Sequence, residues 1–176
     1  MSTYQIDPAH TSAQFKVRHM MIANVKGEFD KVSGTVNFDP ANPAASTIDA
    51  SIDVASISTR DEQRDAHLKS PDFFDVEKFP VITFKSKKVT ATGGDSFTVV
   101  GDLTIHGVTK EVELHVEELT EEAKDPWGNS RRGATARTRV HRKDFGMIFN
   151  VALEAGGFLV GEDVDLTIDV ELIRQA

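Results

Sequence analysis

The sequence predicts an all-β fold of about eight antiparallel strands. Apolar and polar side chains alternate along most of the chain, for example in "STIDASIDVAS" and "EDVDLTIDVELI". Strict alternation is typical of a strand with one buried face and one wet face, which antiparallel sheets allow and parallel sheets do not. Turn material such as "DPANPAAS" and "TGGDS" separates the segments, and no helical pattern stands between most of them. The strands therefore close as a barrel or pack as a sandwich.

The alternating segments follow one another along the chain. We expect strands within residues 12–19, 31–39, 46–56, 81–89, 96–105, 110–119, 134–143 and 162–173. A chain of 176 residues is long enough for one domain with a real core. We therefore expect residues 1–176 to form a single domain.

Several positions on the predicted inner faces are small, namely Ala50, Ser86, Gly101, Ala134, Ala136 and Thr138. A barrel of about eight strands has room for side chains alone, or for one ligand if its lining is small. Small residues among large ones predict either an apolar cavity or a solid core of alternating sizes. The pattern alone leaves both interpretations open.

The charge balance bears on the kind of partner. The chain carries 20 basic and 28 acidic residues, a formal net charge of −8, which argues against DNA or RNA. The run "RRGATARTRVHRK" is a local exception. Alternation puts Arg137, Arg139, His141 and Lys143 on one outer face, between two strands with acidic outer faces, so we interpret it as a stripe of cross-strand ion pairs. The alternative is a patch for nucleic acid or anionic lipid.

Motifs of common enzymes are absent. No phosphate-binding loop, dinucleotide motif, nucleophile elbow or zinc-protease motif occurs, and there is no cysteine. The six histidines form no close pair, so we expect neither a metal ion nor a cofactor. No apolar run reaches the roughly 18 residues of a membrane span, and the first residues lack the pattern of a secretory signal. We therefore expect a cytoplasmic protein without an integral membrane segment.

The segment "TRDEQRDAHLKSPDFFDVEKFP" breaks the alternation and predicts a short helical element around residues 60–75. Thr59 followed by Glu62 matches a capping box, and Pro71 disfavours helical geometry in the residue before it. So slight a helix must lie across another element. Phe73 and Phe74 are large enough to anchor it there.

The charged side chains of this segment allow two interpretations. Arg64, Asp65 and His67 are close in sequence, and an acid/base role at a small site is conceivable. A solvated helix face with local ion pairs is the interpretation that we favour.

Two apolar clusters lie outside the clean strands, "MMIANV" (residues 20–25) and "GMIFNVAL" (residues 146–153). Flexible methionines among aliphatic residues suit a ligand portal or a subunit contact. An ordinary buried segment is the third interpretation.

Four stretches carry a resemblance to a known family. "RDAHLKSPDFFDVEKFPVITFKS" resembles the signature of the YceI-like family of polyisoprenoid-binding, lipocalin-resembling proteins. "IDPAHTSAQFKVRH", "GDLTIHGVTKEV" and "VHRKDFGM" agree with that family in order and spacing. One departure is His141, where family members often carry asparagine. The resemblance covers essentially the whole chain.

The resemblance implies an extended, lipocalin-like eight-stranded antiparallel barrel, a helical segment around residues 60–75, and an elongated apolar pore. It also implies that the protein can form a homodimer. The ligand-binding positions carried over are Phe15, Val17, His19, Phe38, Phe73, Phe74, Phe84, Leu103, Val140 and Arg142. Of these, His19 and Arg142 are the candidates for meeting a ligand's head group, although a histidine such as His19 is more often satisfied within the core.

The function that the resemblance implies is non-enzymatic binding of a long-chain isoprenoid or lipid-like molecule. A polyisoprenoid, an isoprenoid quinone or a fatty-acid-type ligand would be sequestered or carried. Two alternatives stay open at this point. One is an enzyme acting on a small amphiphile at the barrel rim, and the other is a structural barrel filled by its own side chains.

Overall fold

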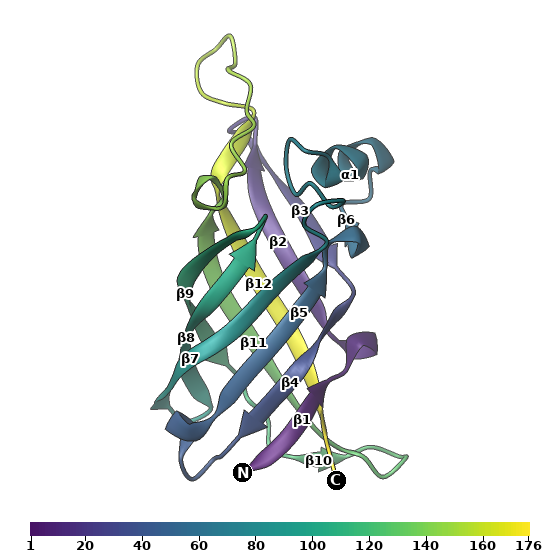
Figure 1. Ribbon diagram of the computed structural model, residues 1–176, viewed down its shortest axis with the longest axis vertical. Coiled ribbons are helices and arrows are strands. Elements are labelled where there is room, and N and C mark those ends of the chain that lie inside the picture. The colour runs from purple at the N-terminus through teal and green to yellow at the C-terminus, as the bar shows by residue number, and fades with distance from the viewer.

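The strands of the computed structural model, which describes residues 1–176, wind round one elongated barrel (Figure 1). Both chain ends lie at one end of this barrel, here called the lower end, and helix α1 (Glu62–Lys69) lies at the upper end. The strands are β1 Ser2–Ile6, β2 Ser12–His19, β3 Ala23–Phe29, β4 Val32–Phe38, β5 Thr47–Asp53, β6 Ile57–Ser58, β7 Val81–Gly93, β8 Ser96–Ile105, β9 Val108–Glu117, β10 Ala123–Lys124, β11 Ser130–His141 and β12 Val160–Arg174.

Strand β12 closes the barrel. Along one edge it pairs with nearly the whole length of β11, from Arg131 opposite Ile173 to His141 opposite Asp163. Along its other edge, the C-terminal part of β12 pairs with β1, and the N-terminal part of β12 pairs with β2. β1 and β2 therefore act as one interrupted barrel strand, and so do β3 with β4 and β5 with β6.

Counted in this way, eight antiparallel strands follow one another round the barrel in sequence order, and the short β10 adds only to the start of β11. The predicted eight-stranded antiparallel barrel with one short helix is confirmed. A sandwich is excluded because β11 and β12 join the two ends of the sheet.

Two of the interruptions are capped by an aspartate. Asp7 accepts a hydrogen bond from the backbone N–H of Ala9 at 3.0 Å, at the start of a 3-10 turn over Pro8–His10. Asp53 does the same for Ala55 at 3.1 Å between β5 and β6. These side chains satisfy backbone groups that leave the ladder, which lets a barrel strand change partner without exposing an unpaired donor.

Helix α1 begins later than the sequence suggested. The cap is Asp61, whose carboxylate accepts the backbone N–H of Arg64 at 3.0 Å, so the prediction of Thr59 as the cap was wrong. Arg60 has a positive φ of 64°, which turns the chain after Thr59 and brings Asp61 into the capping position. The helix ends at Lys69, before Pro71, as predicted. No helix has the length and apolarity to cross a membrane.

The lower half of the barrel is filled by side chains, which we call the lower plug: Tyr4, Phe38, Phe97, Val99 and Leu172. Tyr4 and Val99 are each 1% exposed, and the rings of Phe38 and Phe97 meet edge to face at 5.7 Å. The Arg132 guanidinium lies 6.0 Å from the Tyr4 ring and 5.5 Å from the Phe38 ring. Its Nε also donates to the Tyr4 hydroxyl at 3.0 Å.

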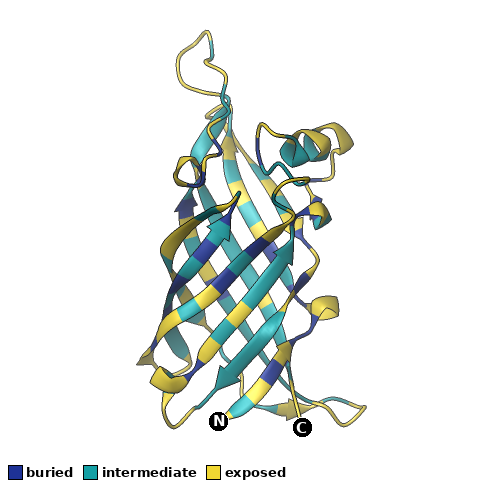
Figure 2. Ribbon diagram, viewed as in Figure 1, coloured by how far each residue is buried: buried dark blue, intermediate teal, exposed yellow.

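The upper half is different. Much of the barrel wall is of intermediate exposure (Figure 2), although residues such as Val54 and Phe145 are buried at this end. Inward aliphatic side chains such as Ile48, Leu166 and Ile168 are only partly covered. They face an open interior volume, which is the candidate site described below.

The outer face confirms the interpretation of the basic stripe. Strand β11 lies between β9 and β12. Arg137 pairs with Glu117 at 3.2 Å and Arg139 pairs with Asp165 at 2.7 Å. Lys143 lies beyond the strand, in the 3-10 turn Arg142–Phe145, and pairs with Glu162. The strand ends at His141, so the expectation that it would reach residue 143 was wrong.

Candidate functional site

An apolar cavity of about 520 Å³ occupies the upper half of the barrel. This volume lies within the range of roughly 300–1,000 Å³ typical of small-molecule sites. Of the 34 residues that line the cavity, 25 are hydrophobic. The cavity settles the question that residue sizes left open, because this part of the interior is not a solid core.

Nine of the ten ligand-binding positions named from the sequence line this cavity: Phe15, Val17, His19, Phe73, Phe74, Phe84, Leu103, Val140 and Arg142. Phe38 does not. Its ring packs on Phe97 in the lower plug, because it stands at the C-terminal end of β4, which runs toward the lower end of the barrel (Figure 1). The structure thus brings nine of the positions together, and their role in ligand binding is taken up as a proposal below.

Two glycines make room for lining phenylalanines. Gly27 on β3 lies opposite Phe15 on β2, and a Cβ atom at Gly27 would overlap the Phe15 ring. A Cβ atom at Gly101 on β8 would lie 2.5 Å from Cζ of Phe84. Each ring therefore lies flat over a bare stretch of backbone, which is a common use of glycine within a strand.

A ladder of aromatic rings fixes the segment after the helix to the barrel wall. The Phe15 ring lies 5.6 Å from the ring of Phe29, and Phe29 meets Phe74 edge to face at 5.7 Å. Aromatic pairs of this kind stabilise a structure beyond the contribution of the apolar area that they bury. Phe74 therefore anchors the segment from β6 to β7 over the cavity, as the sequence predicted for Phe73 and Phe74.

Three rings close over the mouth of the cavity. His67 on α1 meets Phe73 at 5.1 Å and Phe149 at 5.0 Å, and Phe73 and Phe149 lie 5.3 Å apart. We call these three residues the aromatic closure. Phe149 lies in the segment between the 3-10 turn and β12, so the closure joins two elements that are far apart in sequence.

Sequence reasoning missed Phe149 and Met147, which also lines the cavity. The only signal was the apolar run "GMIFNVAL", which suggested a portal without naming the inward side chains. Neither a strand nor a helix sets the direction of side chains in this segment, so periodicity could not identify them.

Arg142 has a structural role that the sequence did not predict. It is only 3% exposed. Its Nε donates to the carbonyl of Gly161 at 2.7 Å, and its Nη1 donates to those of Met147 and Phe149 at 2.7 and 2.9 Å. Its Nη2 donates to Val160 at 3.2 Å. The guanidinium therefore ties the segment that carries Phe149 to the start of β12.

The polar part of the lining gathers at the mouth. Seven of the nine polar lining residues come from the upper end of β2, from α1 and its cap, or from the turn after β11: Arg18, His19, Asp61, Gln63, Arg64, His67 and Arg142. The deeper wall is apolar except for Thr83 and Thr138. This arrangement matches an amphiphile, with an apolar tail inside and a polar group at the opening.

The residues considered for acid/base chemistry are largely engaged in local structure. Thr59 donates its N–H and its hydroxyl to Asp65 at 2.8 and 2.6 Å, and Arg64 donates its Nε to the Thr59 hydroxyl at 2.8 Å. His67 Nε2 lies 2.9 Å from the carboxylate of Asp72. These contacts hold the helix together, and Asp65 is not among the cavity-lining residues.

Exposed apolar side chains surround the mouth, and we call them the apolar rim. They are Met20, Met21, Ile22, Ile148, Val151 and Phe158, six of the nine large hydrophobic residues that are exposed. The two segments that carry them touch, because the N–H of Met20 donates to the carbonyl of Leu159 at 2.8 Å. A buried segment is therefore excluded for residues 20–22, whereas a portal and a subunit contact both fit.

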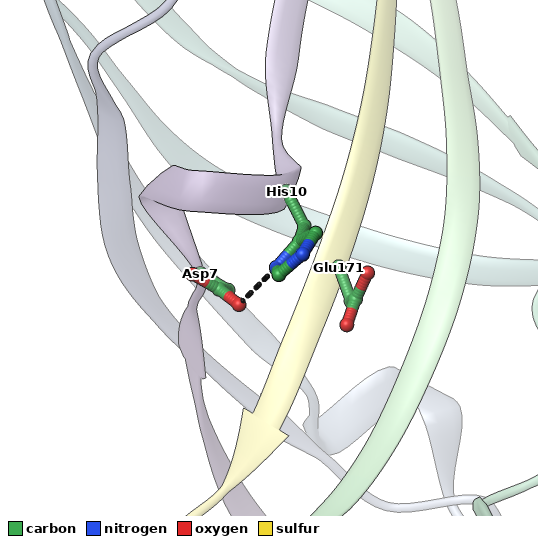
Figure 3. Close-up of side chains that lie close together, drawn as sticks. All are labelled: Asp7, His10 and Glu171. Atoms are coloured by element: carbon green, nitrogen blue, oxygen red, sulfur yellow. Dashed lines mark hydrogen bonds and ion pairs between the residues drawn. The ribbon is translucent and has the colours of Figure 1, made fainter. Parts of the chain in front are cut away.

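A cluster of charged residues lies away from this mouth, at the turn between β1 and β2. Asp7, His10 and Glu171 place one ligand-type atom each within 4.8 Å of one another (Figure 3). However, Arg131 Nη1 donates to Asp7 at 2.7 Å and to Glu171 at 2.8 Å, and its Nε donates to Asp125 at 2.6 Å. A guanidinium already holds the position between these carboxylates, so the arrangement is that of an ion-pair network.

The network shifts the pKa values of its members. The hydrogen bond to His10, supported by Arg131, lowers the pKa of the Asp7 carboxyl. The hydrogen bond from Arg131 lowers the pKa of Asp125 far below its usual range, and the hydrogen bond to Asp7 raises the pKa of His10. The network joins β11, β12 and the turn after β1, and thus fastens the barrel where its first and last strands meet.

Comparison with known proteins places this barrel in a family. The model of the YceI-like domain matches residues 4–172. A UPF0312 protein of Vibrio cholerae is 41% identical over 146 residues, which are 82% of this chain and 77% of the relative. No ligand is named for that protein.

Two solved structures show the same architecture. The crystal structure of the Campylobacter jejuni YCEI protein has a TM-score of 0.73 at 32% identity and covers 90% of each chain. A polyisoprenoid-binding domain from Saccharophagus degradans, implicated in plant cell wall breakdown, has a TM-score of 0.71 at 15% identity and covers 99% of this chain and all of its own. The match over residues 4–172 and the shared barrel lead to one conclusion: this chain belongs to the YceI-like family.

Proposed function

We propose that the protein binds a long-chain apolar amphiphile in the cavity and sequesters or carries it. Polyisoprenoids, isoprenoid quinones and fatty-acid-type molecules all have the required shape. The observation that carries the proposal is the layout of the cavity, which is apolar in its depth and polar at its mouth. The nine lining positions named from the sequence would form the binding site together with Phe149 and Met147.

The energetics suit such a ligand. Burial of a hydrocarbon tail contributes about 0.8 kcal/mol for each methylene group. A long tail in this lining thus binds without many polar contacts. An empty apolar volume of this size is costly to maintain, and water gains little in it.

The same cavity argues for binding rather than catalysis. Two of the acid/base candidates are engaged in local hydrogen bonds, since Asp65 accepts the hydroxyl of Thr59 and His67 contacts the carboxylate of Asp72. The Saccharophagus degradans domain, named as polyisoprenoid-binding, is consistent with the proposed class of ligand. At 15% identity that likeness concerns the fold, so the proposal rests on the cavity. A cytoplasmic location, a single domain over residues 1–176 and a homodimer remain predictions.

Two threonines of β11 provide a direct test. Thr138 lines the cavity, whereas Thr135 lies on the outer face and donates its hydroxyl to Asp169 at 3.1 Å. Thr138→Trp should obstruct the cavity and strongly reduce uptake of an apolar fluorescent dye, while Thr135→Trp should leave uptake unchanged. Displacement of the dye by long-chain alcohols should strengthen with chain length. Equal uptake by both variants would contradict the proposal.

A further inference from the structure

The charged residues that line the cavity mouth are mainly positive. Among the lining residues there are three arginines, Arg18, Arg64 and Arg142, but a single carboxylate, Asp61. This is the reverse of the chain as a whole, whose formal net charge is −8. The carboxylate of Asp61 is also occupied, since it caps α1 through the N–H of Arg64.

Arg142 is a buried cation that forms no direct ion pair, and the nearest carboxylate to act on its charge is that of Glu162, which is itself paired with Lys143. Its four hydrogen bonds all go to backbone carbonyls, and no carboxylate lies within ion-pair distance of it. A guanidinium has five N–H groups, so one N–H of Nη2 has no acceptor. Burying a charge is costly, Glu162 offsets part of that cost from a distance, and an anion in direct contact with the guanidinium would recover more of it.

Arg64 offers a second donor at the same opening. Its Nε and Nη2 are bound to the hydroxyl and the carbonyl of Thr59, both at 2.8 Å. Its Nη1 makes no hydrogen bond, and the residue lines the cavity. The contacts to Thr59 hold the guanidinium in place, so little conformational entropy is lost when Nη1 binds a ligand.

The aromatic closure connects these two arginines. Arg142 donates to the carbonyl of Phe149, the Phe149 ring meets His67 at 5.0 Å, and His67 lies one helical turn from Arg64. His19 lines the same mouth, and its imidazole makes no hydrogen bond within the protein, although its backbone carbonyl accepts the N–H of Ile22. It lies opposite Val160, whose carbonyl is bound by Arg142.

We propose that the head group of the bound amphiphile is an anion, a carboxylate or a phosphate, held at the mouth by Arg64 and Arg142 beside His19. This inference rests on the proposed function. It narrows the ligand class to amphiphiles whose polar end carries negative charge, and it selects against a neutral alcohol of the same length. Charge-assisted hydrogen bonds from guanidinium groups supply that selection.

Ligands with the same tail and different head groups test the inference. Hexadecanoate, hexadecyl phosphate, hexadecanol and hexadecylamine would each displace an apolar dye from the delipidated full chain, below their micellar concentrations. We expect both anions to bind about tenfold or more tightly than the alcohol, as expected for one or two charge-assisted hydrogen bonds. The amine should bind most weakly. The ranking of the two anions identifies which head group the mouth prefers.

Two matched variants locate the effect. Arg64→Gln should lower the affinity for both anions several-fold and leave that for hexadecanol unchanged. Arg60→Gln, a change of the same kind at an exposed residue outside the lining, should change neither. Equal binding of alcohol and anions, unaffected by Arg64→Gln, would overturn the anion inference while the proposed function stands. Failure of all four molecules to displace the dye would overturn the proposed function itself.

Discussion

The two halves of this barrel are built from the same strands but have opposite interiors. In the lower half, Tyr4, Phe38, Phe97, Val99 and Leu172 pack together inside the barrel. In the upper half, the same inward faces border a cavity of about 520 Å³. Strand β12 runs through both, with Leu172 buried at 5% exposure in the lower plug and Leu166 on the cavity wall.

This difference shows that stability and function are separated along one axis. The interior of the lower half is occupied by side chains, and the network around Arg131 fastens the closing strands there. The upper half keeps an open volume between its buried wall residues, and it is closed by rings from two separate segments. Substitutions in the two halves should therefore have different consequences.

The sharpest comparison uses two leucines on the same face of β12. Leu172→Ala should destabilise the protein by about 2–5 kcal/mol, because it opens a void in a packed region. Leu166→Ala should cost about 1 kcal/mol or less, because its side chain already borders free volume. Denaturant unfolding of the delipidated protein measures both. Equal losses would show that the two interiors are packed alike.

The ion-pair network of the lower half should contribute more than the pairs of the outer stripe. Arg131→Gln leaves Asp7, Asp125 and Glu171 without their shared partner, so it should lower the melting temperature clearly. Arg137→Gln removes one exposed pair with Glu117 and should have little effect. Thermal melts at neutral pH compare the two variants. A larger drop in melting temperature for Arg137→Gln than for Arg131→Gln would contradict the greater contribution expected of the network.

The same network predicts a loss of stability in acid. The pKa values of Asp7 and Asp125 are lowered in the folded state, so these carboxylates stabilise it above their unfolded pKa of about 4 and lose that contribution as the pH falls further. Unfolding at decreasing pH should show this loss in the native protein. In Arg131→Gln the free energy of unfolding should fall less steeply with decreasing pH. An unchanged pH dependence would exclude the network as the source of the acid loss.

The aromatic closure should affect ligand release more than stability. Phe149→Ala removes a ring from the mouth but keeps the carbonyl that Arg142 binds, so we expect an apolar dye to dissociate about tenfold faster. Ile148→Ala, at a neighbouring side chain that is 69% exposed, serves as the control and should leave release unchanged. Stopped-flow competition measures both rates. Equal acceleration would mean that the rim, and not the closure, controls release.

The barrel could be predicted because most strands place apolar side chains inward and polar side chains outward, and this alternation is visible in the sequence. All eight expected segments contain strands. The sequence did not reveal β3, because Gly27 stands at an inward position and interrupts the alternation to make room for Phe15. Strand β1 was also missed, since it is only five residues long and is separated from β2 by the turn that Asp7 caps at Ala9.

The site could be predicted where it lies on strands and only partly where it lies on loops. Phe15, Phe84 and Leu103 follow from the direction of inward side chains. Phe149 belongs to a segment without a repeating pattern, and the role of Arg142 depends on carbonyls up to 19 residues away in sequence. Contacts of this kind arise from tertiary structure, so periodicity cannot give them.

The central claim is that the upper half of the barrel holds a long-chain molecule. Native mass spectrometry of the gently purified protein, followed by organic extraction, tests it most directly. The account predicts a bound mass that is released into the organic phase as an unmodified long-chain amphiphile, and that Thr138→Trp does not retain. A protein of bare chain mass that also fails to take up added hexadecanoate or hexadecanol would contradict it.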